Sequence, residues 1–357
     1  MRSMASERRS TTKHWRTKLL AIAAASAVMI PLLAACGSSG TEDPQPQSSG
    51  SAAESSGAFP VTVGGAFGDV TIESKPQRVV ALSPTDADIL IALGITPVAI
   101  PTSAQTNATT NNTGLFPWAE GKYPEGTPKL DLSTANASTL EGILALKPDL
   151  MVGTGLNGLV DQTNAALSDV APVVAFDTQA NGDSWQTSTR KIAKAVGEEA
   201  KGDEIIAKAE AAVTDAAAEN PGLKGKTFNV LITPSASDVY VLCGTDDNLG
   251  RVFEELGMQL TEYARSLPCP GGRTQVSNEN IGSLNADVVV AFPDTEAQMK
   301  TLTDQQLWKT LPAVERGAFV SIPKTDSVPA ALAFPSPTSL EWAVGQMTPQ
   351  LAQAAAK

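Results

Sequence analysis

The stretch VSNENIGSLNADVVVA, Val276 to Ala291, repeats the skeleton of STLEGILALKPDLMVG, Ser138 to Gly153. Four positions coincide at a constant offset: Glu279 with Glu141, Ile281 with Ile143, Leu284 with Leu146, and Asp287 with Asp149. An apolar run typical of a buried strand follows in each copy. The chain therefore carries a glutamate-led helix and its following strand twice, which predicts two related α/β halves.

Strands and helices are predicted to alternate around both copies. In the first half we expect a hairpin over 59–72, strands at 78–83, 95–100, 150–152 and 173–176, and helices at 84–94 and 139–146. Thr85 or Asp86 is expected to cap the helix 84–94, and residues 101–129 to form a long polar loop. In the second half we expect strands at 228–233, 237–242 and 319–322, and helices at 248–256 and 336–357, the last interrupted at Pro349. This order predicts two lobes, each a mainly parallel sheet flanked by helices.

The middle of the chain has a different pattern. Residues 184–219 are predicted to be helical almost throughout, with a break near 197–202. Because this segment stands between two similar halves, we expect it to connect them. The predicted organisation is an N-terminal lobe at 58–183, a connecting helical segment at 184–222 and a C-terminal lobe at 223–357.

The N-terminus has the features of an export signal. A basic leader precedes an apolar run at 19–33, which is shorter than the roughly 20 residues of a membrane-spanning helix. The run ends in Leu33-Ala34-Ala35-Cys36, which resembles the bacterial lipobox. We expect 1–35 to be a lipoprotein signal peptide, Cys36 to carry an acyl anchor that includes palmitate, and 36–57 to form the lipidated end and a flexible tether. The body would then lie on the extracytoplasmic face of a bacterial cell membrane.

Composition excludes several classes of function. The chain has 26 basic and 38 acidic residues, and loss of the leader would leave 20 and 37, so binding to nucleic acid is not expected. The sole histidine, His14, would leave with the leader. Without imidazole there is no Ser-His or Cys-His pair and no zinc site of the usual kinds, so we do not expect an enzyme. The remaining cysteines, Cys243 and Cys269, favour a disulfide in an exported chain, with a reactive thiol as the alternative.

Several segments carry a family resemblance. FPVTV from Phe59, KPQRVVALSP from Lys75, ALGITPVA from Ala92 and LEGILALKPDL from Leu140, together with the mid-chain helix, resemble the solute-binding lipoproteins of ABC importers for ferric siderophores and cobalamin. The resemblance implies two lobes joined by one long helix, with the ligand in the cleft between them. It implies a protein that captures a ferric siderophore and delivers it to the permease and ATPase of an importer. We expect it to act as a monomer.

The same resemblance assigns a role to the repeated glutamates. In that family one acidic residue of each lobe docks onto basic residues of the permease, and these positions correspond to Glu141 and Glu279. A glutamate in the first turn of a helix also offsets the helix dipole, by about 0.3–1 kcal/mol, without any partner. The two roles are compatible.

Iron in a siderophore is already coordinated, so we expect no metal site and no cofactor in the protein. The cleft should instead supply aromatic faces, hydroxyl groups and cations. The candidates are Ser83, Thr85, Trp118, Tyr240, Arg251, Arg265 and Arg273. The ordinary alternatives are solvated arginines and a core position for Tyr240. Residues 101–114 and 268–272 depart from the family, so the chemistry of the cargo cannot be transferred from it.

The sequence is also compatible with other functions. Haem would use arginines for its propionates and one of Tyr123, Tyr240 and Tyr263 as an iron ligand. Cobalamin is the other ligand of the same fold. A cell-envelope scaffold that binds no small molecule, and an exported hydrolase that works through carboxylates, are alternatives from different classes.

Overall fold

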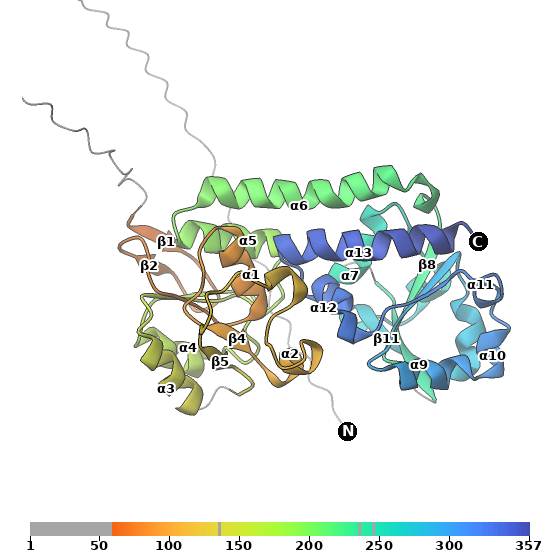
Figure 1. Cartoon of the computed structure of the whole chain (residues 1–357), viewed down its shortest axis with the longest axis horizontal. Coiled ribbons are helices and arrows are strands. Elements are labelled where there is room, and N and C mark those ends of the chain that lie inside the picture. The colour runs from red at the N-terminus through yellow and green to blue at the C-terminus, as the bar shows by residue number, and fades with distance from the viewer. Residues whose placement is uncertain (1–58, 135–136, 235–236, 245–246) are drawn as a thin grey trace, which may run out of the picture. The chain divides into compact units, whose positions relative to one another are not determined.

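The computed structural model describes residues 59–134, 137–234, 237–244 and 247–357 (Figure 1). The predicted signal peptide, Cys36 and the tether lie outside the described residues, so the lipid anchor remains a prediction. Within the described ranges, no helix combines the length and the apolar character that crossing a membrane requires.

The first half contains a three-stranded parallel sheet of order β3-β6-β7. The antiparallel pair β1-β2 confirms the predicted hairpin, and β4 and β5 form a separate parallel pair. The elements are β1 (Val61–Val63), β2 (Val70–Ile72), β3 (Val79–Ala81), α1 (Pro84–Ala92), β4 (Ile100–Thr102), α2 (Ala104–Thr109), the 3₁₀ helix η1 (Pro117–Ala119), β5 (Lys129–Asp131), α3 (Ala137–Leu146), β6 (Leu150–Gly153), α4 (Asp161–Ser168), β7 (Val173–Ala175) and α5 (Trp185–Ala195).

Two predictions for the segment around β4 were wrong. The expected strand at 95–100 starts only at Ile100, and the expected polar loop contains α2. Ser103 caps α2, because its Oγ accepts a hydrogen bond from the amide of Thr106 at 3.1 Å. The helix is followed by Asn111 and Asn112 at positive φ, a backbone conformation that asparagine tolerates better than most residues. The Asn/Thr-rich composition therefore encodes a short capped helix and a tight turn.

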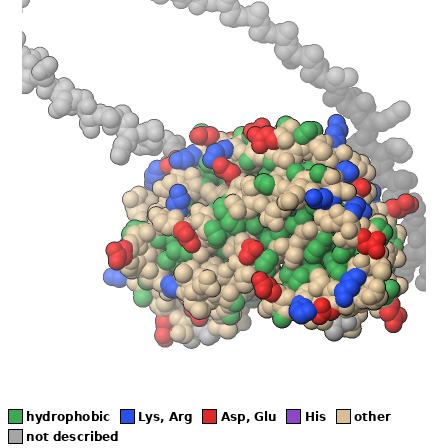
Figure 2. Space-filling model, turned by 45° about the vertical axis from the view of Figure 1, so that its right-hand side comes forward, with side chains coloured by type: hydrophobic (Ala, Val, Ile, Leu, Met, Phe, Trp, Pro, Cys, Tyr) green, Lys and Arg blue, Asp and Glu red, His purple; other side chains and the backbone are tan. Residues whose placement is uncertain are grey.

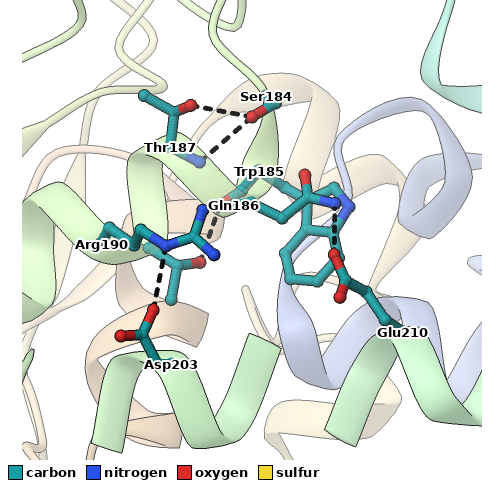
Figure 3. A network of polar contacts seen from close by, with 8 residues as sticks. Ser184, Trp185, Gln186, Thr187, Arg190, Asp203 and Glu210 are labelled. Carbon is teal, nitrogen blue, oxygen red and sulfur yellow. Dashed lines mark hydrogen bonds and ion pairs between the residues drawn. The ribbon is translucent and has the colours of Figure 1, made fainter. Parts of the chain in front are cut away.

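The connecting segment consists of two helices, α5 and α6 (Glu199–Glu219), with the break at 196–198. Gly202 allows them to pack closely, since a Cβ there would lie 2.5 Å from the Cβ of Ala193. Figure 3 shows polar links between the same helices: Arg190 donates to Asp203 at 2.9 Å, and Gln186 donates to Glu210 at 3.0 Å. The chain passes from the first half to the second through α6 alone.

The second half contains one six-stranded sheet of order β11-β9-β8-β12-β13, with β10 paired to β8. The strands β8, β12 and β13 are parallel, whereas β9 is antiparallel to β8 and β11. The elements are the 3₁₀ helix η2 (Pro221–Leu223), β8 (Thr227–Ile232), β9 (Asp238–Leu242), α7 (Asn248–Glu255), β10 (Gln259–Leu260), α8 (Glu262–Ser266), η3 (Pro270–Gly272), β11 (Arg273–Ser277), η4 (Asn278–Leu284), β12 (Val288–Phe292), α9 (Glu296–Thr303), α10 (Gln306–Lys309), α11 (Pro312–Glu315), β13 (Phe319–Ser321), η5 (Lys324–Asp326), α12 (Val328–Ala333) and α13 (Pro337–Ala355).

The repeated stretch occupies equivalent places in the two sheets. β6 lies between the parallel strands β3 and β7, and β12 lies between the parallel strands β8 and β13. The helix before the strand differs, because α3 is an α-helix whereas η4 is a 3₁₀ helix. The internal duplication predicted from the sequence is therefore present as a shared topology with altered local winding.

The last helix, α13, runs beside α6 (Figure 1). The predicted interruption at Pro349 was wrong, since α13 continues through it. Buried Val344, Met347 and Leu351 hold that face of the helix against the core of the second half, and this packing offsets the lost backbone hydrogen bond. The first turns of α13 reach the first half: Trp342 contacts Trp118, with ring centroids 5.2 Å apart. The two halves are thus in contact through α13 as well as connected through α6.

Candidate functional site

A cleft of about 310 Å³ is lined by residues of both halves. Its lining follows the carboxyl ends of the parallel strands: Ser83 comes after β3, Gly155 after β6 and Asn181 after β7, while Ile232 ends β8 and Phe292 ends β12. In sheets of this kind the loops beyond the carboxyl ends of the strands form the usual ligand site. Seen from one side, hydrophobic side chains gather in the middle of the surface and charged side chains lie around them (Figure 2).

Ser83 opens α1 and fixes the first part of the N-terminal wall. Its Oγ accepts from the amide of Asp86 at 3.1 Å and donates to the carboxylate of Asp86 at 2.6 Å. The cap of α1 is therefore Ser83, and the prediction of Thr85 or Asp86 was wrong. Asp86 also accepts from the hydroxyl of Thr154 at 2.6 Å, which ties α1 to the end of β6. Gly155 fits beside this group because a Cβ there would lie 2.5 Å from Ser83 Oγ.

Asp88, two residues after Asp86 on α1, holds the aromatic part of the same wall. It accepts from Trp118 Nε1 at 2.6 Å and from Ser336 Oγ, in the second half, at 3.2 Å. Trp118 stacks on Phe116, with centroids 4.7 Å apart and planes 5° apart, and both rings line the cleft. The indole of Trp118 is therefore fixed by a hydrogen bond at its edge and by a ring on its face.

Burial changes the acidity of these groups. Desolvation raises the pKa of Asp86 to about 6, although hydrogen bonds from Ser83 and Thr154 oppose the change. Desolvation raises the pKa of Asp88 to about 7, against hydrogen bonds from Trp118 and Ser336. Burial raises the pKa of the Tyr123 phenol above its usual range, and the negative charge of Asp88 adds a smaller increase. The carboxyl of Asp88, which lines the cleft, changes its charge near neutral pH.

The C-terminal wall contributes two cations, and each is paired with a carboxylate. Arg273 Nη2 lies 3.2 Å from the carboxylate of Asp247. Lys324 Nζ forms an ion pair with Asp294 and donates to Thr233 Oγ1 at 2.7 Å. This wall also carries Phe334, whose side chain is 43% exposed at the cleft.

The structure brings together four of the seven predicted ligand residues: Ser83, Thr85, Trp118 and Arg273 line the cleft. Tyr240, Arg251 and Arg265 are not among the described residues that line it. Tyr240 is 46% exposed on β9, because the alternation of the strand buries Val239 and Val241 on the opposite face, so the alternative of a core position was also wrong. Arg265 is exposed in the last turn of α8.

Sequence reasoning missed Asp88, Phe116, Lys324 and Phe334. Lys324 follows β13 closely. Because ligands usually bind beyond the carboxyl ends of parallel strands, its position after a predicted strand could have indicated it. Phe116 shares a loop with Trp118, and two aromatic residues so close together in a polar loop were a usable signal. Nothing in the local sequence around Asp88 or Phe334 indicates the cleft, because their positions depend on contacts between the halves.

Two further groups of predicted residues lie elsewhere. Cys243 and Cys269 form a disulfide in the structure, next to the turn that leads to Arg273. Glu141 is exposed on α3 and Glu279 is exposed on η4, where its amide donates to Ser277 Oγ at 3.4 Å. Glu279 lies in the first turn of its helix as predicted, but the same prediction for Glu141 was wrong, because α3 already starts at Ala137. Both glutamates are therefore accessible to a partner. Within the described ranges no group of three or more His, Cys, Asp or Glu side chains is arranged to hold a metal ion.

A family model described as "Periplasmic binding protein" matches residues 79–325, which include both sheets and most of the cleft. The chain belongs to this family. The iron(3+)-hydroxamate-binding protein FhuD of Bacillus subtilis is 27% identical to this binding protein over 330 residues, covering 91% of this chain and 95% of FhuD.

The solved structures similar to this periplasmic binding protein include the following two. A periplasmic solute binding protein from Mycobacterium smegmatis has a TM-score of 0.69 and 29% identity, and the match covers 83% of this chain and 98% of that one. Streptococcus pneumoniae PiaA in complex with ferrichrome has a TM-score of 0.66 and 25% identity, with coverage of 83% and 98%.

Proposed function

We propose that this protein captures a ferric siderophore in the cleft and delivers it to the permease of an ABC importer. The observation that carries the proposal is the lining of the cleft: stacked Phe116 and Trp118, exposed Phe334, and hydrogen-bonding groups from both halves. This combination suits a bulky complex with an organic exterior, which is bound by apolar contact and a few oriented polar groups. Relatives that bind ferric hydroxamate and ferrichrome support it.

The iron of such a complex already has its ligands, so the protein needs only to recognise the outer surface of the chelate. We propose that the protein is not an enzyme and acts as a monomer. Cys36 would carry the lipid that keeps it at the extracytoplasmic face of the membrane, and the disulfide between Cys243 and Cys269 would form after export. A tethered receptor of this kind raises the concentration of its cargo near the importer.

A fluorescence titration tests the proposed ligand class. Trp118 lines the cleft, so a bound ferric complex should quench tryptophan emission. The purified protein would be titrated with a ferric trihydroxamate, a ferric triscatecholate, haem and cobalamin. We expect saturable quenching by at least one ferric siderophore and weaker binding of its iron-free form. Tight binding of only haem or cobalamin would replace the proposed ligand, and a flat response to all four would favour a scaffold.

Transport assays test the docking role of Glu141 and Glu279. Both side chains are exposed, and reversing them to Arg should abolish uptake of the ferric complex while leaving its Kd unchanged. Glu296→Arg is a matched control, because Glu296 is an exposed first-turn acid of α9, as Glu279 is of η4, and no docking role is proposed for it. Equal loss of uptake in the control would refute docking, and a changed Kd would place the glutamates near the ligand.

A further inference from the structure

We infer that the cleft selects ferric chelates that carry no net negative charge, such as neutral or cationic trihydroxamates, over trianionic triscatecholates. This inference rests on the proposed function and names the substrate class of the same cleft. Among the described residues that line the cleft, the charged side chains are Asp88, Arg273 and Lys324. Each of these three side chains already contacts a partner in the protein.

Arg273 is held by a carboxylate on its own wall. Its Nη2 donates to Asp247 at 3.2 Å, and the Asp247 side chain is only 16% exposed. Separating a largely buried carboxylate from its cation would leave that carboxylate desolvated and unpaired, which costs free energy. Arg273 therefore offers its remaining N–H groups to a ligand, but little uncompensated charge.

Lys324 is compensated in the same way. Its ammonium group is paired with Asp294 and bonded to Thr233. Asp294 is itself fixed, because Gln298 Nε2 donates to its carboxylate at 3.0 Å and Gln298 Oε1 accepts from its amide at 2.7 Å. The ion pair raises no net positive potential at the cleft, and the network around Asp294 keeps the carboxylate in place.

The N-terminal wall adds a carboxyl group, that of Asp88, whose hydrogen-bond donors are uncharged. Asp88 accepts from Trp118 and Ser336, and its titratable neighbours are Asp86 on the same helix and the phenol of Tyr123. Once Asp88 is ionised, the charged residues of the cleft lining and their ion-pair partners amount to two cations and three carboxylates: Arg273, Lys324, Asp88, Asp247 and Asp294. An anionic chelate would meet a surface without the positive charge it requires.

A neutral trihydroxamate matches this surface. Its carbonyl and N–O oxygens can accept from the N–H groups of Arg273 that do not contact Asp247, without displacing that carboxylate. Its organic exterior can cover Phe116, Trp118 and Phe334. A cationic chelate would additionally gain from Asp88. A trianion would have to displace Asp247 or Asp294 from its cation, or remain unpaired beside Asp88.

The first experiment compares Kd values at pH 8 and low ionic strength for a neutral ferric trihydroxamate, a cationic one and a trianionic ferric triscatecholate. We expect the triscatecholate to bind at least about 100-fold more weakly than the neutral complex. Equal or tighter binding of the triscatecholate would overturn the inference while leaving the proposed function intact. Binding of none of the three would overturn both.

The second experiment uses variants that release the cations. Asp247→Asn and Asp294→Asn keep the shape of the side chain and remove its charge, so each should strengthen binding of the triscatecholate about tenfold. The Kd of the neutral trihydroxamate should change less than about threefold. Asp203→Asn is the control, because it removes the carboxylate of an ion pair with Arg190 outside the cleft lining. An unchanged preference in both cleft variants would show that the paired carboxylates do not set the selectivity.

Discussion

The N-terminal wall of the cleft holds its carboxyl group, Asp88, with hydrogen bonds from an indole and a hydroxyl, whereas the C-terminal wall pairs Arg273 and Lys324 with carboxylates. The two arrangements respond differently to their surroundings. A buried acid with neutral donors changes charge when the pH moves through its pKa. Paired charges respond instead to loss of the partner. The pH sensitivity of the cleft is therefore expected to come from the first half, and its selectivity for charge from the second.

The largest expected effect concerns Asp88 and the pH dependence of stability. Its folded-state pKa of about 7 lies above its ordinary value of 3.8, so the native state binds this proton more tightly than the unfolded chain does. Between these two values the free energy of unfolding should fall as the pH rises, by about 1.4 kcal/mol for each pKa unit. The total contribution of Asp88 is on the order of 4 kcal/mol. Asp88→Asn, which still accepts from Trp118, should remove it.

Urea unfolding at pH 4.5 and pH 8 checks this prediction. The variant should lose less stability than the unchanged protein over that interval, although Asp86, with its pKa raised to about 6, still contributes some slope. Asp215→Asn, on an exposed position of α6, is the control and should leave the slope unchanged. Identical slopes for Asp88→Asn and the unchanged protein would mean that Asp88 is not desolvated as the structure indicates.

The two walls differ in how much of each can be predicted from the sequence. The repeat around Glu141 and Glu279 predicted the central strands β6 and β12, because local hydrophobic patterns specify buried strands directly. The position of Ser83 at the cleft followed from the strand before it. The ion pair of Arg273 with Asp247 could not be predicted, because these residues meet only after β11 has paired with β9.

Tyr240 and Asp88 show the same division between local and distant causes. Tyr240 was a candidate for the site, but its strand also contains Val239 and Val241, and alternation alone directs it away from the core they occupy. Asp88 has no sequence signal, because one of its two hydrogen-bond donors, Ser336, comes from the far end of the chain. Short-period hydrophobic patterns therefore predicted the strands and the face on which a side chain lies. They could not predict the two walls of the cleft, because contacts between distant segments complete both walls.

The second prediction concerns the disulfide behind the C-terminal wall. Cys243 and Cys269 are separated by 26 residues, and in the chain-entropy model closing a loop of that size stabilises the fold by about 3 kcal/mol. Cys243→Ala with Cys269→Ala should lower the free energy of unfolding by about that amount. Because the closed loop leads into Arg273, ligand affinity should also fall modestly.

Denaturant unfolding with and without a reductant measures this effect. The reductant should destabilise the unchanged protein and have no effect on the double variant, which serves as the control. The N-terminal wall should keep its pH response in both cases. A reductant that leaves the unchanged protein unaffected would show that the two thiols are not joined in the purified protein.

The smallest expected effect separates the aromatic residues of the two walls. Phe334 is 43% exposed, so a ligand that covers the ring gains apolar burial that the free protein lacks. Phe334→Ala should therefore weaken binding of the ferric complex about tenfold, equivalent to about 1.4 kcal/mol, and leave stability nearly unchanged.

Trp118 is already stacked on Phe116 and bonded to Asp88, so Trp118→Ala should weaken binding and also lower the melting temperature. Calorimetric Kd and thermal unfolding measured on both variants check this difference. If Phe334→Ala lowered the melting temperature as much as Trp118→Ala, the ring would be part of the fold, and the C-terminal wall would lack a free aromatic surface for the ligand.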